Sequence, residues 1–236
     1  IITVPVLVAC FMQFGFEEAI MIHMAVGTSL GCIVFTGMSS AYAHNKKNGI
    51  NYNFFKPIAS GIIIGAFIGA LFAVQLNGNF LKVIIGIFAL LVAFQMSANK
   101  EIKLKPRNKI NKEPYFVGSG IGFLSSILGI GGGIFSVPYL KASGLPMTSS
   151  VGTSAACGVP IAIFGALGYF AAGLNNSLLP SFTLGYIYLP ALIGISFTSI
   201  IAARYGAEIA HRVSEKILKR MMACMMFVIS FYMVFS

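Results

Sequence analysis

The sequence has few charged side chains and no tryptophan. Charged residues make up 9% of its 236 residues, and Asp and Glu together number 6. A soluble domain carries about 25% charged residues, so this composition excludes an ordinary water-soluble fold. Acids and histidines are also scarce in the apolar segments, which argues against a buried cation-binding site and leaves an anion as the more fitting ligand.

The residues of several enzyme and metal sites are also missing. No Ser-His-Asp set, HExxH helix or acidic pair falls within an apolar segment, so we expect no enzyme. The four cysteines stand singly without CxxC spacing, which excludes a disulfide framework and a zinc site. The chain has a formal charge of +10, but its Lys and Arg lie almost entirely between apolar segments, where membrane topology and lipid headgroups account for them. We therefore expect no metal, no cofactor and no nucleic acid.

What the sequence has in abundance is apolar length. Hydrophobic residues make up 57% of the chain, and its mean hydropathy is +0.88. A helix needs about 20 mostly apolar residues to cross a bilayer, so the chain predicts an all-α polytopic membrane protein of about seven or eight transmembrane helices. The predicted spans are 19–43, 56–76, 79–98, 115–143 with an interruption, 147–172, 179–203 and 216–235, and residues 1–14 form the end of one more.

The two sides of the chain resemble each other. Val4-Pro5-Val6-Leu7 is echoed by Val137-Pro138-Tyr139-Leu140, and Val26-Gly27-Thr28-Ser29 by Val151-Gly152-Thr153-Ser154. The match continues near the end of each half, where 81–94 aligns with 218–231 without a gap. Such repetition in the same order predicts a duplicated bundle.

The duplication sets the predicted domain organisation. We expect a first repeat at 1–98, a basic cytoplasmic linker at 99–114 and a second repeat at 115–236. Ile1 aligns with Ile134, so we expect the first repeat to be truncated at its N-terminus, with its first helix missing. If every segment crosses the membrane, the repeats are parallel; if the glycine-rich segment turns back, the second repeat is inverted.

The most informative segment is the run of glycines at 129–133, followed by Pro138. Several glycines and then a proline inside an apolar segment favour a broken helix, with breaks marked by Pro138 and by its counterpart Pro5. The N-terminus of a half-helix attracts negative charge, so Gly131, Gly132 and Gly133 are candidate anion-binding residues. Close helix packing through glycine is the alternative explanation.

A polar face follows each proline motif. Its hydroxyl groups can bind an oxyanion or can bond carbonyls of their own helix. The equivalent cysteines can face each other across the repeat axis and contact a sulfur-bearing substrate, or serve as small apolar residues. The candidate substrate-binding residues on these faces are Thr28, Ser29, Cys32, Thr153, Ser154 and Cys157.

Two further features have simple structural interpretations. Gly61, Gly65 and Gly69 form a GxxxGxxxG face, which predicts close approach of two helices. The titratable residues near the first spans are Glu17, Glu18, His23 and His44, and we expect them at the membrane interface.

The GIGGGIFSVPYL run at 129–140, the AVGTSLGC run at 25–32 and the segment 40–49 resemble the TauE/SafE sulfite exporter family, also called the 4-toluene sulfonate uptake permease family. The resemblance covers nearly the whole chain. It implies a bundle of about eight helices made by duplication, which moves small anions such as sulfite, sulfonates or related organosulfur compounds across the bacterial inner membrane.

We therefore expect a membrane permease or exporter for a small sulfur-containing oxyanion, working by alternating access between two repeats. Protons are the candidate coupling ion, although no clear proton carrier stands out. The alternatives are a non-transporting membrane scaffold or assembly subunit, whose glycines only pack helices, and a cation or metal permease.

Overall fold

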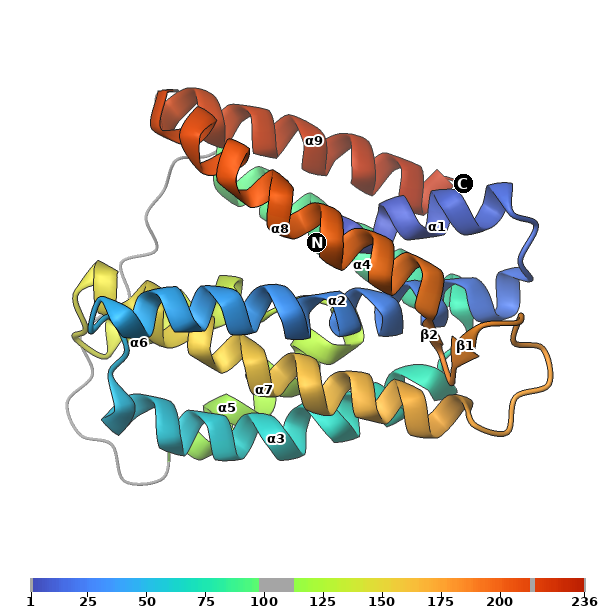
Figure 1. Ribbon diagram of the computed structural model, residues 1–236, viewed down its shortest axis with the longest axis horizontal. Helices are drawn as coiled ribbons and strands as arrows, with labels where there is room; N and C mark the ends of the chain where they lie inside the picture. Colours follow the sequence, from blue (N-terminus) through green and yellow to red (C-terminus); the bar gives the residue numbers. More distant parts are fainter. Residues whose placement is uncertain (1, 98–112, 213–214, 236) are drawn as a thin grey trace.

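The computed structural model describes residues 2–97, 113–212 and 215–235, which form an elongated bundle of helices (Figure 1). Helices joined by short connections lie antiparallel to one another. The elements are α1 (Thr3–Gln13), α2 (Glu18–Lys46), α3 (Tyr52–Gln75), α4 (Gly78–Ser97), α5 (Glu113–Leu128), α6 (Gly133–Ala142), α7 (Met147–Gly173), β1 (Thr183–Leu184), β2 (Ile187–Tyr188), α8 (Leu189–Arg212) and α9 (Glu215–Phe235).

The expected all-α membrane fold is confirmed. Among the described residues, four helices are long and apolar enough to cross a membrane, namely α2, α3, α4 and α7. Shorter apolar helices lie at Thr3–Gln13, Leu189–Ser199 and Arg220–Met233. Large apolar side chains remain exposed along the outer faces of the bundle, as expected of a surface that contacts lipid.

One predicted span has the wrong start. The segment 179–203 does not begin as a helix, because β1 and β2 form an antiparallel hairpin that pairs Thr183 with Tyr188. Phe182 and Gly185 have positive φ angles of 66° and 54°, which a helix cannot accommodate. The helix of this segment, α8, starts only at Leu189.

The glycine-rich segment turns back within the bundle. Helix α5 runs parallel to α3, because Gly61 packs against Tyr115 and Ser119 while Gly69 packs against Phe123. Helix α6 then runs antiparallel to α7, and the chain returns to the end of the bundle at which α5 began. Of the two topologies that the sequence left open, the structure has the one in which this segment does not cross.

This reversal gives the two halves opposite directions. A short helix precedes a long one in each half, α1 before α2 and α6 before α7, and α2 and α7 run antiparallel side by side (Figure 1). Two more helices follow in each case, α3 and α4 in the first half and α8 and α9 in the second. The division into two repeats stays a prediction, and this arrangement agrees with inverted repeats.

The glycine face of α3 packs as predicted. A Cβ atom at Gly65 would overlap the backbone of Ser119 on α5, and one at Gly118 or Gly122 would overlap the backbone of α3. The Ser119 hydroxyl also donates a hydrogen bond of 3.1 Å to the carbonyl of Gly61. Glycines on both helices therefore let the two backbones touch, and this contact fixes the position of α5 and of the segment that follows it.

Candidate functional site at the break between α5 and α6

Gly129 ends α5 by adopting a left-handed conformation, with φ of 66°. The N-H of Ile130 then donates to the carbonyl of Ser125 at 3.0 Å, the longer of the two hydrogen bonds of a Schellman motif. Helix α2 holds this turn in place, because the Ser29 hydroxyl donates to the carbonyl of Gly129 at 2.9 Å. The hydroxyl of Ser29, which was predicted to bind substrate, is thus hydrogen-bonded to the backbone of the break.

Gly132 is the N-cap residue of α6, also with a left-handed φ of 72°. A Cβ atom at this position would collide with Cδ1 of Ile161 on α7 and would lie 3.1 Å from Oγ of Ser125. The Gly132 carbonyl accepts the N-H groups of Phe135 and Ser136, each at 3.0 Å. Glycine is required here both by the backbone angle and by the lack of space.

The start of α6 presents backbone donors that have no acceptor within the described part of the chain. These are the N-H groups of Gly131, Gly132, Gly133 and Ile134. Gly133 is exposed, Gly131 and Ile134 are half-buried and Gly132 is buried, so this end of α6 is partly open to the outside of the bundle. The unpaired N-H groups and the helix dipole together give this end of α6 a partial positive charge.

Ser125 is a residue of this site that sequence reasoning missed. Its side chain is fully buried, and its Oγ has no hydrogen-bond partner among the described residues. The hydroxyl lies beside Gly132, at the start of α6. A buried hydroxyl without a partner costs free energy, so its retention next to unpaired N-H groups points to a ligand. The sequence signal was a serine one turn before the glycine run.

Ser136 and Ser154 complete the polar cluster. Their hydroxyl oxygens lie 2.6 Å apart, and Ser136 Oγ also lies 2.9 Å from the Gly132 carbonyl. Ser154 Oγ would be 3.7 Å from a Cβ atom at Gly133, so α7 brings this predicted residue to the start of α6. Ser136 was not predicted, although it stands in the same motif.

Other predicted ligands lie elsewhere. Thr28 accepts the N-H of Tyr188 at 2.9 Å, and Thr153 accepts the N-H of Asn51 at the same distance, so both hydroxyls hold connections between helices. Cys32 Sγ lies 3.9 Å from the carbonyl of Leu192 on α8. Cys157 is fully buried on α7. Of the predicted hydroxyl ligands, the structure brings only Ser29 and Ser154 to the break.

The helix breaks predicted at Pro5 and Pro138 are wrong in position. Pro5 is the third residue of α1, where the missing N-H would have no helical acceptor. Pro138 is the sixth residue of α6, and the helix continues through it to Ala142. The interruption falls earlier, at 129–132, because the positive φ angles of Gly129 and Gly132 end one helix and begin the next.

A comparison with known proteins identifies the family of the chain. A model of the sulfite exporter TauE/SafE family matches residues 1–233. The chain belongs to this family. Because the match covers nearly the whole chain, it includes both halves of the bundle and the break between α5 and α6.

Relatives within the TauE/SafE family are named as probable membrane transporter proteins. One from Haemophilus influenzae is 32% identical over 234 residues, which cover 99% of this chain and 89% of the relative. One from Methanocaldococcus jannaschii is 28% identical over 233 residues, which cover 97% of this chain and 85% of the relative. One from Bacillus subtilis is 36% identical over 143 residues, half of each chain. No solved structure matches the chain.

Proposed function

We propose that this member of a membrane transporter family moves a small sulfur-containing oxyanion, such as sulfite or a sulfonate, across the bacterial inner membrane. The anion binds at the start of α6, where the N-H groups of Gly131, Gly132 and Gly133 are free and the buried hydroxyl of Ser125 has no partner. The unpartnered Ser125 beside these donors is the observation that carries the proposal.

The composition of the site favours an oxyanion over a cation. N-H groups donate hydrogen bonds and cannot accept them, and the dipole of α6 is positive at this end. The Ser125 hydroxyl, which has no partner among the described residues, can donate to a further oxygen of a small trigonal or tetrahedral anion. Within the described residues, no group of three or more His, Cys, Asp or Glu side chains could hold a metal ion. Membership of the sulfite exporter family is what suggests sulfur chemistry for the anion.

The topology supplies a route for alternating access. Helix α7 carries Ser154 to the site, α2 holds the break through Ser29, and these two long helices belong to opposite halves. Rocking of one half against the other would move the two sets of contacts apart and open the site to the opposite side. The end of the bundle where α2 finishes at Lys46 is the cytoplasmic end in this proposal, because the helices flanking the basic segment 98–112 also reach it.

The test measures thermal stability of the purified protein against sulfite, sulfate, thiosulfate and a sulfonate, with chloride at matched ionic strength as control. A specific site predicts selective stabilisation by one sulfur oxyanion, of about 2.7 kcal/mol at one hundred times its dissociation constant. Equal responses to all anions would overturn the proposal and favour a non-transporting scaffold.

Ser125→Ala sharpens this test. Removal of an unpartnered buried hydroxyl should leave the ligand-free protein as stable as the wild type or more stable, while the response to the anion is lost. Ser126→Ala is the matched control, because the hydroxyl of Ser126 donates to Phe123 of its own helix at 3.0 Å. An undiminished anion response in Ser125→Ala would remove this hydroxyl from the site.

A further inference from the structure

His23 lies buried near the start of α2, with 4% of its surface exposed, and its expected place at the membrane interface stays a prediction. Its Nε2 is 3.2 Å from the carbonyl oxygen of Ala73 and 3.1 Å from that of Leu76, at the end of α3. Its Nδ1 is 3.3 Å from the carbonyl oxygen of Ala19 in its own helix. Both ring nitrogens therefore face carbonyl oxygens.

The carbonyl partners of both nitrogens suit the protonated form of the ring, whereas its burial opposes a positive charge when no anion is bound nearby. A neutral imidazole has one N-H and one lone pair, so one of its nitrogens would face a carbonyl oxygen without a hydrogen between them. The imidazolium ion donates from both nitrogens and satisfies all the contacts. The last carbonyls of α3 also carry the negative end of the helix dipole, which attracts a cation.

We propose that His23 is the proton-binding site of the transporter, and that it holds a proton while the anion is bound at the start of α6. This inference rests on the proposed function. Ser29, which contacts the break, follows His23 by six residues on α2, about 9 Å along the helix axis. The anion site lies farther along the helix, because a Cβ atom at Gly131 would lie 3.5 Å from Ile33, which follows His23 by ten residues or about 15 Å along the axis. Across this weakly polar interior a positive charge on His23 stabilises a bound anion, and the anion in turn raises the affinity of His23 for its proton.

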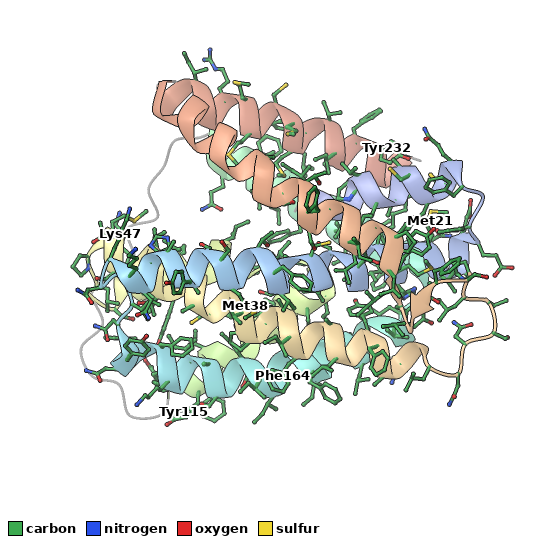
Figure 2. All side chains as sticks on the ribbon, in the orientation of Figure 1. Met21, Met38, Lys47, Tyr115, Phe164 and Tyr232 are labelled. Carbon is green, nitrogen blue, oxygen red and sulfur yellow. The ribbon has the colours of Figure 1, made fainter. Side chains whose placement is uncertain are left out.

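Water can bring the proton close to His23. A cavity of about 350 Å³ lies at the start of α4 and is lined by Glu18, Ile22, Gly78 and Lys82 among others, although His23 itself is not part of the lining. Ile22 directly precedes His23, and Gly78 follows the connection whose carbonyl accepts the imidazole. Hydronium in this cavity would give its proton to the ring nitrogen that carries the lone pair and leave as water. Figure 2 labels Met21, another residue of this lining.

Titratable groups from other elements also surround the site. The ring of Tyr186, in the hairpin turn, lies 5.6 Å from that of His23, and Tyr169 of α7 lies edge-on to Tyr186 at 6.5 Å. Glu18 of α2 and Lys82 of α4 bring one charge of each sign to the cavity. His44 lies near the other end of α2, away from these groups, so a variant at His44 serves as the control.

Uptake of radiolabelled sulfite into proteoliposomes, with and without an imposed pH gradient, tests the inference. His23→Gln keeps an amide donor for the α3 carbonyls but cannot bind a proton at neutral pH. We expect the wild type and His44→Gln to concentrate sulfite when the gradient is imposed. His23→Gln should accumulate about tenfold less sulfite, or even less, a change that lies within the usual range of coupling between two binding sites. The variant should still exchange external for internal sulfite. Accumulation by His23→Gln equal to that of the wild type would overturn the inference.

The outcomes separate the inference from the proposed function. A wild type that exchanges sulfite but does not respond to the pH gradient would contradict only the proton site, whereas a wild type without exchange would contradict the proposed function as well. If His23→Gln fails to fold, nitrogen NMR of histidine-labelled wild type replaces it. Both ring nitrogens of His23 should then be protonated in the presence of sulfite at neutral pH, and a neutral ring that sulfite does not change would refute the proposal.

Discussion

Replacement of Gly132 by alanine would test whether the chain really breaks at the start of α6. The φ angle of 72° at this position costs a residue with a Cβ atom about 1–2 kcal/mol. The new atom would also collide with Cδ1 of Ile161, and overpacking of this kind costs about 1–3 kcal/mol. The expected total, about 2–5 kcal/mol, corresponds to a fall in melting temperature of about 5 °C or more.

Gly120→Ala and Ile161→Val provide the controls. A Cβ atom at Gly120, on the same helix as Ser125, would meet nothing within 4 Å, so this variant should be as stable as the wild type or gain about 1 kcal/mol in helix propensity. Ile161→Val removes Cδ1, and in that background Gly132→Ala should cost only the backbone contribution of about 1–2 kcal/mol. Unchanged melting of Gly132→Ala, or strict additivity with Ile161→Val, would refute the geometry of the break.

Three other substitutions test the surroundings of the site. Ser154→Ala removes a hydrogen bond of 2.6 Å at the start of α6, so it should cost about 0.5–1.5 kcal/mol in thermal stability and weaken the sulfite response; an unchanged response would place α7 outside the site. Gly65→Ala should lower expression and the melting temperature sharply, because its Cβ would overlap the backbone of Ser119, and normal melting would contradict the packing of α3 on α5. Ser230→Ala loses a 2.8 Å hydrogen bond from α9 to α4 and should cost about 0.6 kcal/mol with sulfite binding intact, as measured by melting with and without sulfite.

The composition of the sequence and the spacing of its residues were sufficient to predict a membrane protein and a helix interrupted by glycines. Apolar runs of about 20 residues place the long helices, since few other folds tolerate them. The glycine run at 129–133 predicted an interruption, because glycine alone adopts positive φ readily. The spacing of Gly61, Gly65 and Gly69 predicted a close helix pair, which the contact with α5 confirms.

The sequence could not show which polar residues meet. Thr28 and Ser29 are neighbours on α2 and look equivalent in a pattern, but their side chains leave the helix in different directions, and only Ser29 reaches the break. Ser125 stands one turn before the glycine run, but its lack of a partner is visible only once α5, α6 and α7 are packed. The hairpin at 183–188 was missed because its apolar residues continue those of α8.

Sulfite transport by wild type, Ser125→Ala and Ser126→Ala tests the central claim most directly, with initial uptake rates measured in proteoliposomes over a range of sulfite concentrations. A hydrogen bond from a buried hydroxyl to an anion contributes about 1.5–3 kcal/mol, so Ser125→Ala should raise the KM for sulfite by about tenfold or more, while Ser126→Ala stays close to the wild type. Equal KM values in all three proteins, with sulfite transport intact, would contradict an anion site at the start of α6.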